Sequence, residues 1–114
     1  MSEVSLYHNP RCSKSRQTLA LLEERGIEPE IIEYLKTPPD AATISGLLGK
    51  LGIPAIELIR RGDAPFAELG LADGDDAALI EAMVSHPILI QRPIVVSGEQ
   101  ARIGRPPENV LEIL

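Results

Sequence analysis

Cys12 is the only cysteine of this 114-residue chain, and it lies in a run of polar and cationic residues, His8-Asn9-Pro10-Arg11-Cys12-Ser13-Lys14-Ser15-Arg16. A single cysteine is often a small buried apolar residue, but a core position is not expected in a turn rich in proline, serine and asparagine. The cations Arg11, Lys14 and Arg16 favour a thiolate, which is the nucleophilic form of cysteine. Because cationic neighbours lower the thiol pKa from its free value of about 8.5, we predict that Cys12 is a reactive nucleophile.

The residues on either side of this run are predicted to form a strand and a helix. Val4-Ser5-Leu6-Tyr7 alternates apolar and polar residues as a strand does, and apolar residues recur at helical spacing from about Ser15 to Arg25. Cys12 is therefore expected at a strand-to-helix turn, where free backbone N–H groups and the helix dipole stabilise an anion. Ser13 or Ser15 is expected to cap the helix through its hydroxyl.

The remaining pattern predicts an α/β domain. A second strand is expected at 30–34, parallel to the first, because so short a strand, helix and strand unit implies a right-handed crossover. A helical insertion is expected at about 38–85, and its first helix should begin after Thr37, whose hydroxyl would cap it. Pro93–Val96 and Ala101–Ile103 are predicted to form a hairpin. A closing helix is expected to pack through Val110, Leu111 and Leu114.

Composition and charge limit the classes of function. At 114 residues, the chain fits a single domain covering 1–114. A net charge of -6 argues against a general affinity for nucleic acid, and no apolar run near ~18 residues predicts a membrane span or an export signal. The cytoplasm is the expected location. One cysteine and two distant histidines, His8 and His86, give no ligand spacing of the zinc type, so neither a metal nor a bound cofactor is expected.

Three separated motifs occur in the order found in one known family. They are the strand leading to His8-Asn9-Pro10-x-Cys12-x-x-Ser15-Arg16, then His86-Pro87-Ile88-Leu89-Ile90-Gln91-Arg92-Pro93-Ile94-Val95-Val96, and then Ile103-Gly104-Arg105-Pro106-Pro107-Glu108. With these motifs, the chain resembles the glutaredoxin-coupled arsenate reductase family over essentially its whole length. The resemblance implies a thioredoxin-like (glutaredoxin-like) α/β fold with a helical insertion between the second and third strands.

The resemblance also implies roles for single residues. Cys12 is the nucleophile, and His8 is the histidine that helps to ionise it. Three arginines surround the oxyanion, and their family positions fall on Arg60, Arg92 and Arg105, with Arg61 as the neighbour that competes with Arg60. Guanidinium forks suit this task because they pair the several oxygens of a tetrahedral oxyanion bidentately. The residues that support the cysteine are Asn9, Ser15 and Arg16, and the peptide bond before Pro93 is implied to be cis and to face the cysteine.

The activity that the resemblance implies is the reduction of arsenate, or of a related oxyanion, by a monomeric enzyme. Cys12 attacks the arsenic to form a thioarsenate. Because the chain has no second cysteine, the resolving thiol must come from outside, and the resemblance implies glutathione as co-substrate and glutaredoxin as partner. Ser15 stands where dithiol proteins carry their second cysteine, and its hydroxyl is expected to cap the helix or to bind the thiolate.

Two other functions stay open at this point. The first is a glutathione-dependent thiol-transfer enzyme, in which the arginines and Lys14 bind the carboxylates of glutathione. The second is a regulator of the Spx type, which shares this fold and binds RNA polymerase. Spx-type proteins usually carry Cys-x-x-Cys, so Ser15 argues against that alternative. Ser13-Lys14 follows the cysteine where authentic arsenate reductases tend to carry glycine and threonine, which leaves the physiological oxyanion open.

Overall fold

The computed structural model describes residues 4–60, 70 and 74–114. Contacts divide the chain into two units, of which the first contains Met1–Thr37 and Arg92–Leu114 and the second contains Pro38–Gln91. The second unit nearly coincides with the helical insertion expected at about 38–85. That the whole chain forms a single domain stays a prediction.

The first unit is built on a four-stranded sheet with the strand order β2-β1-β3-β4. Its strands are β1 (Val4–Tyr7), β2 (Glu30–Ile32), β3 (Ile94–Ser97) and β4 (Gln100–Ile103). As predicted, β1 and β2 are parallel and β3 and β4 form an antiparallel hairpin. Gly98 occupies the hairpin turn with a φ of 61°, a backbone conformation that glycine adopts without strain. The second strand is shorter than expected, because it ends at Ile32 and not at residue 34.

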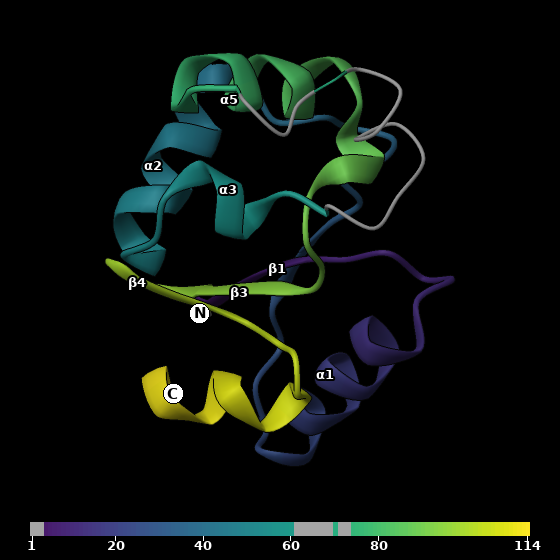
Figure 1. Cartoon of the computed structure of the whole chain (residues 1–114). Helices are drawn as coiled ribbons and strands as arrows, with labels where there is room; N and C mark the ends of the chain where they lie inside the picture. Colours follow the sequence, from purple (N-terminus) through teal and green to yellow (C-terminus); the bar gives the residue numbers. More distant parts are fainter. Residues whose placement is uncertain (1–3, 61–69, 71–73) are drawn as a thin grey trace. The chain divides into compact units, whose positions relative to one another are not determined.

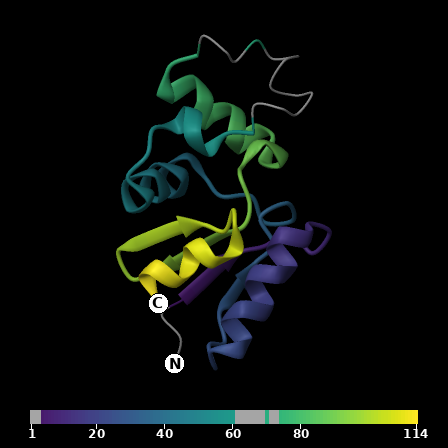
Figure 2. The same cartoon turned by 60° about the horizontal axis from the view of Figure 1, so that its bottom comes forward.

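Two helical segments cover one face of this sheet, as Figure 1 and Figure 2 both show: α1 (Ser13–Glu24) and η3 (Pro107–Ile113). The core between them and the sheet consists of Val4, Leu6, Leu22, Val95, Val110 and Ile113. The closing segment is a 3-10 helix, so residues three apart share a face. Val110 and Ile113 are therefore buried, whereas Leu114, which the sequence placed in the core, is exposed.

The second unit is mainly helical where the structure describes it, with one isolated antiparallel bridge between Ile59 and Ile90. Its helices are α2 (Ala41–Leu51), α3 (Ala55–Leu58), α5 (Asp76–Ser85) and the 3-10 segment η2 (Pro87–Leu89). The prediction that Thr37 caps the first helix is wrong. Asp40 is the N-cap and accepts a hydrogen bond of 2.8 Å from the backbone N–H of Thr43. Two successive prolines, Pro38 and Pro39, delay the helix because a residue before proline avoids helical backbone angles.

No helix in the described part of the chain combines the length and the apolar character that crossing a membrane requires.

Candidate active site

Cys12 is the N-cap residue of α1, with extended backbone angles and a partly buried side chain. The turn before it is closed by a 2.9 Å hydrogen bond from the N–H of Cys12 to the carbonyl of Asn9, and by a 3.0 Å bond from the N–H of Arg11 to the Asn9 side chain. The predicted strand-to-helix turn is thus confirmed. The predicted serine cap is wrong, because Cys12 itself occupies the N-cap position and no side chain caps α1.

Burial of the Cys12 thiol by itself would raise its pKa, but hydrogen bonds from its surroundings outweigh this effect and lower the pKa below its usual range. The donors are the backbone N–H of Ser15, the guanidinium of Arg92 and the backbone N–H of Lys14. The helix N-terminus therefore acts as predicted. The cationic side chains next to Cys12 in sequence are not among the main causes of the lowered pKa, and the guanidinium of Arg16 donates a 2.8 Å hydrogen bond to the carbonyl of Pro10.

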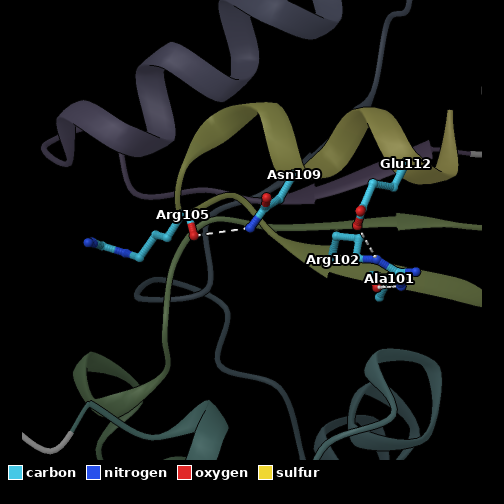
Figure 3. Close-up of polar contacts among 5 residues, drawn as sticks. All are labelled: Ala101, Arg102, Arg105, Asn109 and Glu112. Carbon is cyan, nitrogen blue, oxygen red and sulfur yellow. Dashed lines mark hydrogen bonds and ion pairs between the residues drawn. The ribbon is translucent and has the colours of Figure 1, made fainter.

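Two predicted oxyanion ligands, Arg92 and Arg105, lie at the thiol. Nη2 of Arg105 is 3.7 Å from Sγ of Cys12, and its Nε donates a 2.7 Å hydrogen bond to the carbonyl of Arg92. Figure 3 shows the Arg105 side chain pointing away from η3, while the Arg105 carbonyl accepts a bond from Asn109. Arg102, by contrast, pairs with Glu112 at 3.0 Å and takes no part in the site.

The guanidinium of Arg92 is only partly satisfied. Its Nε and Nη1 are buried and have no hydrogen-bond partner within the described residues. A buried charged donor without a partner is costly, and an anion between Arg92 and Arg105 would supply the missing acceptors. The peptide bond from Arg92 to Pro93 is cis, and so is the bond from Arg105 to Pro106, which the sequence did not indicate.

The structure buries four polar side chains among the residues it describes, and all four lie around the Cys12 turn: His8, Asn9, Ser15 and Thr18. Nδ1 of His8 is 2.6 Å from Oγ of Ser15, which also accepts a 3.0 Å hydrogen bond from the N–H of Asn9. The Ser15 hydroxyl therefore holds the loop to the helix. The prediction that it caps the helix or binds the thiolate is wrong. The role of His8 in ionising Cys12 stays a prediction, because its hydrogen bond goes to Ser15.

Burial lowers the pKa of His8, with Arg16 adding to this effect and Glu33 opposing it. The folded protein therefore binds a proton at His8 less readily than the unfolded chain does, where the pKa is about 6.5. We expect the stability contributed by neutral His8 to be complete above about pH 6.5 and to be lost as the pH falls toward the folded pKa. Denaturant unfolding at pH 7.5 and pH 5.5 measures this loss. In His8→Asn, the free energy of unfolding should differ less between the two pH values. His86→Asn, at the exposed end of α5, should keep the difference seen in the natural protein.

Arg60 belongs to the second unit, where it follows α3 and donates its backbone N–H to the carbonyl of Leu89 at 2.6 Å. Arg61 lies outside the described residues. The role that the resemblance assigns to Arg60 stays a prediction. Within the described ranges, no group of three or more histidine, cysteine or acidic side chains is arranged to hold a metal ion.

A pocket of about 320 Å³ opens beside the Cys12 turn. Its lining comes from the residues just before Cys12 and from the segment after β2, namely His8, Asn9, Pro10, Arg11, Glu33, Leu35 and Lys36. Lys36 forms an exposed ion pair of 3.5 Å with Glu33. The pocket therefore offers two cations, one carboxylate and an apolar side chain to a small charged molecule.

The sequence did not reveal how tightly the segment before Arg105 packs against α1 and Pro93. Gly104 is buried between Pro93 and Thr18, and neither Gly104 nor Thr18 was singled out. The available signal was a glycine directly before a candidate oxyanion ligand, since such a glycine often marks a close approach of two backbone segments.

The chain is similar to known proteins in both sequence and overall fold. The ArsC family model matches residues 7–113. The YfgD protein of Escherichia coli K12 is 57% identical over 115 residues, covering 98% of this chain and 97% of the relative. A protein of the same bacterium named arsenate reductase is 47% identical over 116 residues, which cover all of this chain and 82% of that protein. The solved arsenate reductase from Vibrio cholerae superposes with a TM-score of 0.96 at 52% identity and covers 97% of both chains.

The chain therefore belongs to the ArsC family. Its fold is the predicted thioredoxin-like α/β fold, with a helical insertion between the second and third strands.

Proposed function

We propose that this protein reduces arsenate to arsenite by nucleophilic catalysis at Cys12. The observation that carries the proposal is the pairing of a thiol of lowered pKa with the guanidinium groups of Arg92 and Arg105, of which Arg92 has two buried nitrogens, Nε and Nη1, without an acceptor among the described residues. The names of its relatives support arsenate as the oxyanion.

In the first step, the thiolate of Cys12 attacks arsenic(V). A sulfur–arsenic bond forms, and one arsenate oxygen leaves as water after taking up protons. Arg92 and Arg105 stabilise the charge that develops on the remaining oxygens, which is the kind of electrostatic stabilisation that dominates such sites. The arsenic is not yet reduced at this stage.

In the second step, the thiolate of glutathione attacks Sγ of Cys12. A sulfur–sulfur bond forms, and the electron pair of the sulfur–arsenic bond passes to arsenic, which leaves as arsenite, arsenic(III). The two sulfurs are oxidised to a mixed disulfide. A thiolate of glutaredoxin then attacks the glutathione sulfur and releases the Cys12 thiolate by ordinary thiol–disulfide exchange.

The pocket beside the Cys12 turn supports glutathione as the thiol. Glutathione carries two carboxylates and one ammonium group, and the pocket presents the cations Arg11 and Lys36 together with the carboxylate of Glu33. It also lies next to the turn that holds the nucleophile. A small peptide thiol bound there would have its charged ends paired close to the thioarsenate.

Replacing Lys36 by alanine is therefore expected to raise the KM for glutathione by about twofold to fivefold, the scale of one exposed ion pair. The KM for arsenate should stay unchanged, because the oxyanion meets Arg92 and Arg105. Steady-state kinetics with each substrate varied in turn measures both constants. The matched control is Lys50→Ala in the last turn of α2, and an equal rise of the glutathione KM in this control would contradict the assignment.

The overall function is tested by incubating the protein with arsenate, glutathione and glutaredoxin, and by measuring arsenite. A parallel reaction offers a glutathione mixed disulfide in place of arsenate. Turnover of arsenate supports the proposal. Turnover of the mixed disulfide alone would replace it with thiol transfer, and turnover of neither, with a folded protein that binds RNA polymerase, would favour the regulatory alternative.

A further inference from the structure

Gly104 stands between β4 and Arg105, in a space that has no room for a side chain. A Cβ atom at this position would lie 2.6 Å from Oγ1 of Thr18, 2.8 Å from Cγ of Pro93 and 3.4 Å from Cδ of Pro93. The first two distances are far inside van der Waals contact. The backbone of Gly104 therefore lies directly against the side chains of α1 and of the Pro93 segment.

Neither neighbour can move away without loss. Thr18 is fully buried, and its hydroxyl donates a 2.9 Å hydrogen bond to the carbonyl of Lys14 in the first turn of α1. Threonine is stiff about its first side-chain torsion, so a rotation that relieved the contact would break this bond. Pro93 is a rigid ring, and its carbonyl accepts a 2.9 Å hydrogen bond from the N–H of Gly104.

This contact joins the two halves of the site. On one side, Thr18 is bonded to the helical turn whose N–H groups stabilise the Cys12 thiolate. On the other side, Gly104 precedes Arg105, and Pro93 follows Arg92. Arg105 and Arg92 are further tied by the bond between the Arg105 Nε and the Arg92 carbonyl.

We propose that Gly104 and Thr18 are positioning residues, whose direct contact sets the separation between the Cys12 thiolate and the guanidinium groups of Arg92 and Arg105. The proposal rests on the proposed function in taking Cys12 as the reacting group and arsenate as the oxyanion bound by Arg92 and Arg105, whereas the alkylation profile against pH is independent of arsenate. Neither residue touches the thiol or the oxyanion. They act through the two backbone segments that they hold together.

Gly104→Ala tests this role. The added Cβ should push the Arg105 segment away from α1, and a displacement of about 1 Å in such a site costs up to about 100-fold in rate. We expect the kcat/KM for arsenate to fall by about 10-fold to 100-fold. The rate of Cys12 alkylation by iodoacetamide, followed against pH, should show a midpoint shifted upward, and arsenate should protect Cys12 less well from alkylation.

The control variants are Gly46→Ala and Gly49→Ala in α2, where a Cβ would meet nothing within 4 Å. Both should keep the alkylation profile of the natural protein. The double variant Thr18→Ala with Gly104→Ala removes the shortest contact, and it should return the alkylation midpoint and the arsenate protection part of the way toward the natural values.

If Gly104→Ala is too unstable to purify, Thr18→Ala and Thr18→Val carry the test. Thr18→Ala opens the contact and should weaken arsenate protection, whereas Thr18→Val keeps the volume and should weaken it less. A folded Gly104→Ala protein with an unchanged alkylation profile and unchanged arsenate protection would overturn the proposal. So would equal protection in the two Thr18 variants. Because alkylation needs no arsenate turnover, failure of the proposed function would appear separately, as a natural protein that does not produce arsenite.

Discussion

Replacement of Cys12 by serine is expected to lower the turnover of arsenate by about 10⁴-fold or more, the scale on which an enzyme loses activity with its nucleophile. A serine hydroxyl stays protonated near neutral pH, so neither the N–H groups of α1 nor Arg92 can convert it into an anion. The fold should be kept. Position 12 is the N-cap of α1 and carries no capping side chain, and serine is a favoured N-cap residue that can add up to about 1 kcal/mol to stability.

Arsenite production and denaturant unfolding of the same samples measure the two expectations. Ser13→Ala is the matched control, because Ser13 is the exposed next residue and makes no contact that the mechanism uses. It should retain turnover close to that of the natural protein. A Cys12→Ser protein with even half of the original turnover would show that another group attacks the arsenic.

Replacement of Arg92 by alanine has the second largest expected effect, a loss of about 10²-fold to 10³-fold in kcat, as when one oxyanion donor is removed. Two causes act together. The oxyanion loses a guanidinium whose buried Nε and Nη1 have no acceptor among the described residues, and the pKa of Cys12 rises because Arg92 no longer favours the thiolate. In the pH profile of kcat/KM, the midpoint should therefore move to higher pH and the maximum value should fall.

Arg102 provides the control for Arg92. It is a strand residue of the same unit, but its guanidinium pairs with Glu112 on the surface, and Arg102→Ala should leave both kcat and the pH profile unchanged. Arg92→Lys should recover part of the thiolate stabilisation and little of the oxyanion binding, since lysine lacks the bidentate fork. If Arg92→Ala moved the midpoint of the kcat/KM profile to higher pH without lowering kcat, Arg92 would favour the Cys12 thiolate but would not stabilise the oxyanion.

Local sequence was enough to place Cys12 at the turn between β1 and α1. Alternation over Val4–Tyr7 and the prolines and serines of the next residues are signals within about 20 positions, and each has one main structural outcome. The same local signals predicted that the N-terminus of α1 stabilises the thiolate, but they did not reveal the contribution of Arg92. Arg92 reaches Cys12 only through the antiparallel pairing of β3 with β1, and that pairing depends on the whole sheet.

The details that failed share a physical cause, which is competition between local alternatives of similar energy. Thr37 and Asp40 both cap helices, and the prolines between them decided in favour of Asp40. The closing segment has apolar residues that fit either helical period, and tertiary packing selected the tighter 3-10 winding that buries Ile113. The contact of Thr18 with Gly104 joins residues far apart in sequence, so no pattern along the chain could reveal it.

The hydroxyl of Ser15 has a consequence for how this protein meets oxidative stress. It is fully engaged with His8 and with the backbone of Asn9, so the position cannot take a resolving cysteine without opening the loop that shapes the turn. Because Cys12 is the single cysteine, an oxidised Cys12 cannot form an internal disulfide. Recovery then depends on small thiols from outside, one to convert the Cys12 sulfenic acid into a mixed disulfide and a second to reduce that disulfide, and where such thiols are scarce the sulfenic acid is exposed to irreversible oxidation to the sulfinic acid.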